Sequence, residues 1–120
     1  MLNHIVMLKF KKTVTEESIK ELEALMEDLP NKIIEIHSYE FGRDILHSER
    51  SYDFALVSLF ANTESLQRYQ VHPEHQKLLK KLVPLCEHIC TVDFMGTDAS
   101  DFKEKSPEAD LGSWDIGPKI

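Results

Sequence analysis

Apolar residues follow two alternating rhythms along the chain, one typical of strands and one typical of helices. Four short stretches are rich in β-favouring residues, which predicts strands. Between them, apolar residues recur every three or four positions, as on one side of a helix. The expected strands are 4–10, 33–41, 52–60 and 88–95, and the expected helices run from caps at 13–15 to 29–31, from 62–64 to 69, and from 73 to about 83.

The first and third expected strands are apolar on both faces. Successive side chains of a strand point to opposite sides, so Val6, Leu8 and Phe10 share one face. Ile5 and Met7 share the other. A sheet that is apolar on both sides needs cover on both sides.

Caps and prolines indicate where the helices begin and end. Thr13 opens a capping-box pattern, and Thr15 is a second candidate cap. Pro30 is expected to end the first helix. Asn62 is expected to cap the second helix, and Pro73 marks the start of the third.

The order strand–helix–strand, occurring twice, predicts an α+β fold of the ferredoxin-like, split βαβ type. Its four-stranded antiparallel sheet has the first and third strands at the centre and the helices on one face. The sheet of a second subunit would cover the opposite face. The sequence therefore predicts a homodimer through the sheet face, closed as a dimeric α/β barrel.

Length and composition place these elements in one domain, followed by a segment of different character. The chain has 120 residues, of which 42% are hydrophobic and 29% charged, as in a globular protein. From Gly96 onward, acids are mixed with Gly, Ser and Pro without periodicity. We expect a domain over 1–95 and an acidic, flexible tail over 96–120.

Charge and hydropathy argue against two classes of partner. The formal net charge of −7 would repel a phosphate backbone, so no nucleic-acid partner is expected. There is no charged-then-apolar leader and no apolar run long enough for a bilayer, which predicts a cytoplasmic protein without a membrane partner. Thiols stay reduced in that compartment, so Cys86 and Cys90 are expected to be free.

Zinc-type donors are present in the second half of the chain, at His72, His75, Cys86, His88 and Cys90. Structural zinc sites need four converging donors, and the paired C-x-x-C pattern typical of them is absent. We predict no metal and no cofactor.

The segment from Tyr69 to His75 gathers polar groups where the second helix breaks and the third begins. Pro73 suits the first turn of a helix, because its missing N–H has no intrahelical partner there. His72 precedes it and is expected to cap the helix or hold the bend.

Two residues of this segment, His75 and Tyr69, are candidates for chemistry. His75 is in phase with Leu79 and Leu82 and should face inward, either as a general acid or base or as a core-edge histidine bonded to a backbone carbonyl. The Tyr69 hydroxyl can donate to a developing oxyanion, or its ring can simply fill the helix break.

His4 and Asp93 form a second candidate pair. The first and last strands are expected to be antiparallel neighbours, so the start of one lies beside the end of the other. A carboxylate there can orient His4, and an equally open alternative is a structural pair that braces the end of the sheet.

Five segments together resemble the stress-responsive dimeric α/β-barrel (Dabb) domain family. The resemblance covers about residues 1–95, and its most recognisable part is Tyr-x-x-His-Pro-x-His from Tyr69 to His75. The segments are 4–11, 39–44, 52–57, 69–75 and 92–94.

The resemblance implies a ferredoxin-like protomer that dimerises through its sheet. A plant member of the family is a polyketide cyclase in which a tyrosine and a histidine of this segment perform an aldol condensation, and by motif position these are Tyr69 and His75. That member has a histidine in its third strand where this chain has Phe54. Some relatives bind a metal at the dimer interface through main-chain groups.

Three functions follow as hypotheses. The first is binding of a small apolar or aromatic ligand in a pocket between sheet and helices, with His4, Asp93 and His72 around it. The second is a cofactor-free cyclase or lyase acting on a polyketide-like substrate, with His75 as acid or base and Tyr69 as oxyanion donor. The third is a purely structural dimerisation module.

Overall fold

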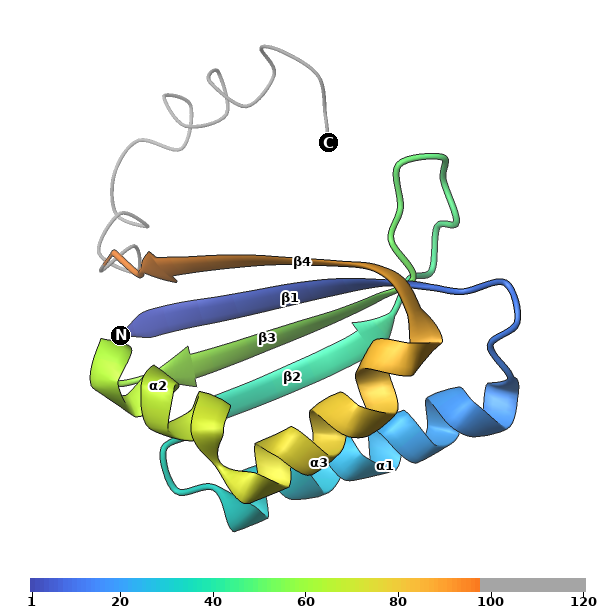
Figure 1. Ribbon diagram of the computed structural model, residues 1–120. Helices are drawn as coiled ribbons and strands as arrows, with labels where there is room; N and C mark the ends of the chain where they lie inside the picture. Colours follow the sequence, from blue (N-terminus) through green and yellow to red (C-terminus); the bar gives the residue numbers. More distant parts are fainter. Residues whose placement is uncertain (98–120) are drawn as a thin grey trace, which may run out of the picture.

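Strands and helices alternate along residues 1–97, which are the residues that the computed structural model describes (Figure 1). The elements are β1 (Leu2–Phe10), α1 (Glu16–Lys32), β2 (Ser38–Arg43), β3 (Phe54–Phe60), α2 (Thr63–Val71), α3 (Pro73–Leu82), a 3₁₀ turn (Val83–Leu85) and β4 (Cys86–Met95).

The four strands form one antiparallel sheet in the order β2-β3-β1-β4. The first and third strands therefore lie at its centre, and the three helices lie along one side of it (Figure 1). This arrangement confirms the predicted ferredoxin-like, split βαβ fold.

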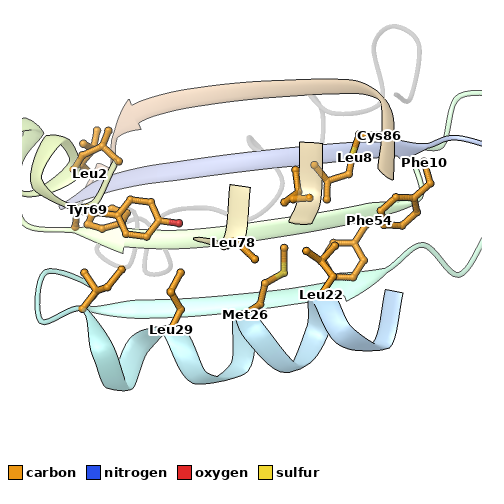
Figure 2. Packing of buried hydrophobic residues seen from close by; sticks show 14 residues of the cluster. Leu2, Leu8, Phe10, Leu22, Met26, Leu29, Phe54, Tyr69, Leu78 and Cys86 are labelled. Carbon is orange, nitrogen blue, oxygen red and sulfur yellow. The ribbon is translucent and has the colours of Figure 1, made fainter. Parts of the chain in front are cut away.

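The covered face of the sheet, which looks toward the helices, carries the core. Figure 2 shows Leu22, Met26 and Leu29 of α1 pointing at the sheet, together with Leu78. Burying one such side chain contributes about 1.5–3 kcal/mol. The sheet residues buried on this face are Leu2, His4, Leu8 and Phe10 of β1 and Phe54, Leu56, Ser58 and Phe60 of β3.

The outer face of the same sheet is also apolar, as predicted, but within residues 1–97 no helix covers it. Met7 keeps 37% of its surface exposed and Val57 keeps 39%, although both lie on central strands. The apolar residues of the outer face are Ile5, Met7, Ala55, Val57, Leu59, Cys90, Val92 and Phe94.

At helix α1 the second candidate cap, Thr15, is confirmed, and the predicted end at Pro30 is wrong. Thr15, and not Thr13, is the cap, with its Oγ1 accepting the Ser18 N–H at 3.2 Å. Pro30 lies inside the helix, which runs on to Lys32. A proline there costs about 3 kcal/mol, and burial of Leu29 on one side and of Ile33 on the other offsets this.

The second strand is shorter at its start than predicted, because residues 33–37 form a turn. Ile33 is buried and its N–H caps α1 by donating to Leu29 O. The Ile36 N–H then donates to Ile33 O, and Ile34 is 93% exposed. The apolar run at 33–36 thus closes a helix, and β2 begins only at Ser38 and continues to Arg43.

Smaller differences, of one or two residues, occur at other boundaries. β3 begins at Phe54, two residues later than predicted, because Asp53 lies outside the ladder and its Oδ2 accepts the Phe10 N–H. β4 begins at Cys86, two residues earlier, and α3 ends at Leu82.

The break between α2 and α3 lies where it was predicted. Asn62 caps α2 by accepting the Ser65 N–H at 2.9 Å. His72 ends α2 and caps α3, and Pro73 occupies the first turn of α3.

No helix within residues 1–97 is long and apolar enough to cross a bilayer. The predicted flexible tail over 96–120 falls, from residue 98 onward, outside the described residues.

Candidate functional site

A cavity of about 180 Å³ lies between the covered face of the sheet and helices α2 and α3. Three residues with titratable side chains, His4, Tyr69 and His75, line it together with Gln70 and Thr91. Its apolar walls are Val6, Leu56, Leu78, Leu79, Leu82 and Ile89.

A larger hollow of about 610 Å³ lies near the other end of β1, and several of its charged side chains are held in ion pairs. Arg43 pairs with both Glu16 and Glu23, and Lys9 lies 4.0 Å from Asp53. The smaller, mainly apolar cavity has more of the character of a ligand site, which needs apolar walls and a few convergent polar groups.

His75 is held by a main-chain carbonyl at the start of α3. Its Nδ1 lies 3.1 Å from Gln70 O, and because a carbonyl oxygen can only accept, Nδ1 carries the hydrogen. In the neutral imidazole Nε2 is then the acceptor. Burial lowers the pKa of His75, and the bond to Gln70 O opposes this shift only in part. The lowered pKa favours the neutral form near pH 7.

The structure confirms that His75 is bonded to a backbone carbonyl, and its role as a general acid or base stays a prediction. His75 is buried, and it also lines the cavity. The carbonyl bond does not compete with a role in the cavity, because it uses Nδ1 and leaves Nε2 without a partner among residues 1–97.

Tyr69 is 1% exposed and its ring lies 4.2 Å from that of His75, between ring centres. Figure 2 shows the side chain extending into the layer between sheet and helices. Its hydroxyl lies 3.2 Å from the Tyr39 hydroxyl. Burial raises the pKa of Tyr69, so the phenol stays protonated and can donate.

His4 and Asp93 are paired across β1 and β4, as the predicted strand order requires. Nδ1 of the buried His4 is hydrogen-bonded to Asp93 Oδ1. The His4 ring lies edge-on to Tyr69, with 6.2 Å between ring centres. Two imidazoles, each oriented through Nδ1, therefore lie next to Tyr69.

His72 has a structural part in this arrangement. Its Nδ1 accepts the Glu74 N–H at 3.1 Å, which satisfies one of the free donors at the start of α3. Neither His72 nor Asp93 is among the residues that line the cavity.

Sequence reasoning missed Tyr39 and the Gln70 carbonyl. Tyr39 pairs with Ser58 in the β2–β3 register and points the same way as Phe41. The alternation of side chains along the second strand was visible in the sequence. The contact of Tyr39 with Tyr69 of α2, however, depends on how that helix packs against the sheet. The carbonyl of Gln70 is a main-chain group, for which side-chain patterns carry no signal.

The zinc-type donors do not converge. Within the described part of the chain, no three His, Cys, Asp or Glu side chains lie close enough to hold a metal ion. Cys86 and Cys90 are free thiols, and burial raises the pKa of Cys86 to about 11, which suits a small core residue.

Comparison with known proteins gives one family match and two curated relatives. Residues 2–96 match the Stress responsive A/B Barrel Domain (Dabb) family model. The stress-response A/B barrel domain-containing protein HS1 of Arabidopsis thaliana is 26% identical over 101 residues, 81% of this chain and 91% of that protein. Olivetolic acid cyclase of Cannabis sativa is 30% identical over 74 residues, 60% of this chain and 73% of the cyclase.

Solved structures share the fold. A dimeric ferredoxin-like protein of unknown function from Thermobifida fusca has a TM-score of 0.74 at 28% identity, covering 79% of this chain and 90% of that one. A similar dimeric protein from Bacteroides fragilis has a TM-score of 0.72 at 30% identity, covering 79% and 95%. Hydroxynitrile lyase from Passiflora edulis has a TM-score of 0.74 over 81% and 94% of the two chains, and its 20% identity supports likeness of fold alone.

Proposed function

Because the chain belongs to the stress-responsive A/B barrel domain family, we propose that it binds a small apolar or aromatic ligand in the cavity between its sheet and helices α2 and α3. An apolar cavity of about 150 Å³ accommodates benzene. The present cavity, at about 180 Å³, therefore suits a ligand with a single ring.

The observation that carries this proposal is the meeting of apolar walls with polar groups of fixed orientation. Gln70 O orients His75 and Asp93 orients His4, so each imidazole has Nε2 left for a ligand. Purely structural buried histidines would have no need of an adjoining void. The cavity thus favours a binding protein over a module whose only role is dimerisation.

A second candidate function is cofactor-free acid–base catalysis, favoured by the contact between Tyr69 and His75. Nε2 of neutral His75 can take a proton from a substrate, and the Tyr69 hydroxyl can donate to the oxyanion that forms. Their ring centres are 4.2 Å apart and both side chains line the same cavity, which supports placing them in one site. Similarity to olivetolic acid cyclase agrees with a cyclase-type reaction on a polyketide-like substrate.

The proposal includes a homodimer formed through the outer face of the sheet. Met7 and Val57 are apolar, lie on central strands and are partly exposed. An apolar sheet face of this kind is typical of an interface. The relatives from Thermobifida fusca and Bacteroides fragilis are described as dimeric.

A cavity-filling variant tests the binding function. Thr91 lines the cavity from β4 and is itself exposed, so Thr91→Phe adds a ring without overpacking the core. We expect the variant to lose affinity for phenol by more than tenfold in an NMR titration. The control is Ile34→Phe, which adds the same ring at a fully exposed turn. Equal phenol affinity in both variants would exclude this cavity as the site.

A further inference from the structure

The hydroxyls of Tyr39 and Tyr69 lie 3.2 Å apart and join the edge strand β2 to helix α2. Tyr69 lines the cavity and Tyr39 does not, so Tyr39 reaches a ligand only through Tyr69. Within residues 1–97 neither hydroxyl has another hydrogen-bond partner. When the cavity holds no ligand, the two hydroxyls are therefore hydrogen-bonded to each other, and either one can be the donor.

The direction of this hydrogen bond decides what Tyr69 offers to the cavity. A hydroxyl donates one hydrogen bond and accepts others. When Tyr69 donates to Tyr39, its proton is used. When Tyr39 donates to Tyr69, the Tyr69 proton is free for a ligand, and each bond in such a chain strengthens the next.

Both phenols stay protonated at neutral pH, so both directions are available. Burial raises the pKa of Tyr39 to about 12 and also raises that of Tyr69. Of the two ring side chains on the helix side of the cavity, Tyr69 is the donor, because neutral His75 offers only the acceptor Nε2. A ligand that is to use this donor needs an acceptor oxygen of its own.

We propose that Tyr39 is a positioning residue that turns the Tyr69 hydroxyl toward the ligand and so makes the cavity selective for single-ring ligands carrying a carbonyl or another acceptor oxygen. This selectivity rests on the proposed ligand-binding function. An acceptor ligand lets Tyr69 donate to it while Tyr39 donates to Tyr69. A ligand without an acceptor leaves the two hydroxyls bonded to each other and gains nothing from them.

Two probes that differ in one carbonyl test this selectivity. The full chain is titrated with acetophenone and with ethylbenzene, and we expect acetophenone to bind more tightly. Tyr39→Phe keeps the ring and removes the hydroxyl that holds the Tyr69 O–H toward the ligand. It should weaken acetophenone binding by up to about 10-fold, the net value of a Tyr69–ligand hydrogen bond that is no longer oriented. Its ethylbenzene affinity should stay within about twofold.

The matched control is Tyr52→Phe, since Tyr52 is the third of the chain's three tyrosines and does not line the cavity. It should leave the affinity ratio of the two probes unchanged. Tyr39→Phe also strands a buried hydroxyl on Tyr69, which lowers stability. A second comparison therefore uses Tyr69→Phe as the background. There, removing the Tyr39 hydroxyl should leave the affinity ratio unchanged, because Tyr39 acts only through Tyr69.

The outcomes separate the two levels of the proposal. If the wild-type chain binds both probes and Tyr39→Phe weakens them equally, or leaves both unchanged, the role of Tyr39 is overturned while ligand binding stands. A change of the ratio in the Tyr69→Phe background overturns it as well. If the wild-type chain binds neither probe, the proposed function is overturned together with this inference.

Discussion

Both faces of the sheet carry apolar side chains on its central strands, but the two faces have different surroundings. On β1, Leu8 is fully buried beneath the helices, whereas its neighbour Met7 is partly exposed on the outer face. On β3 the same contrast holds between Leu56 and Val57. Strand composition therefore does not decide which face becomes the core. The helices do, by covering one side with their own apolar stripes.

The two faces also differ in their polar groups, because the covered face holds buried polar side chains. On the covered face, buried polar side chains are costly unless they are hydrogen-bonded, so each one is informative. Ser58 donates to His4 O, and His4 itself is bonded to Asp93. These polar groups lie beside the cavity, so the candidate site is on the covered face. For the outer face we propose association with a second subunit.

The largest expected effect is on the free energy of unfolding, when two adjacent residues of β1 are each replaced by alanine. Leu8→Ala should lower the free energy of unfolding by about 2–5 kcal/mol, because it opens a void in a fully packed core. Met7→Ala removes a side chain that is partly exposed in the single subunit, so it should cost less than half as much when both variants are compared as monomers, at low protein concentration. Urea denaturation of both variants provides the measurement, and a larger cost for Met7→Ala would reverse the assignment of the two faces.

The next prediction tests whether the outer face is an interface. Val57→Lys places a charge at the centre of that face and should weaken dimerisation by about 30-fold or more, which corresponds to ~2 kcal/mol. Analytical ultracentrifugation across a dilution series measures this change. Ile34→Lys places the same charge at an exposed turn away from both faces and should leave the association unchanged. A Val57→Lys protein that dimerises like wild type would contradict the sheet-to-sheet interface.

The smallest expected effect is the dependence of stability on pH. The folded-state pKa of His75 is lowered, so the unfolded chain binds more protons between that pKa and the ordinary value near 6.5. Stability should therefore fall as the pH drops below about 6.5, with a slope of at most ~1.4 kcal/mol per pH unit for one proton. The matched variant is His75→Gln, which should remove this part of the slope in thermal melts at pH 5 to 8. An identical slope in both proteins would show that His75 titrates normally.

Local rules predicted some parts of this structure well, because the causes lie within a few residues. The cap at Asn62 and the helix restart at Pro73 depend on neighbouring backbone groups. The pairing of His4 with Asp93, which are 89 positions apart, followed instead from the predicted order of the strands. In each case the sequence contained all the information that the feature needs.

Other parts depend on packing between distant elements. The turn at 33–37 looked like a strand, because the burial of Ile33 against the core is decided by where α1 meets the sheet. Pro30 is tolerated in α1 for a similar reason. The bond between Tyr39 and Tyr69 joins residues thirty positions apart and has no local signature.

The most direct test of the central claim asks which face of the sheet a bound aromatic ligand contacts. Intermolecular NOEs between phenol and assigned methyl groups distinguish the two faces in one experiment. We predict NOEs from the phenol ring to the methyl groups of Leu78, Leu79 and Leu82, which line the cavity. NOEs confined to Ile5, Val57 and Val92 on the outer face would contradict the account.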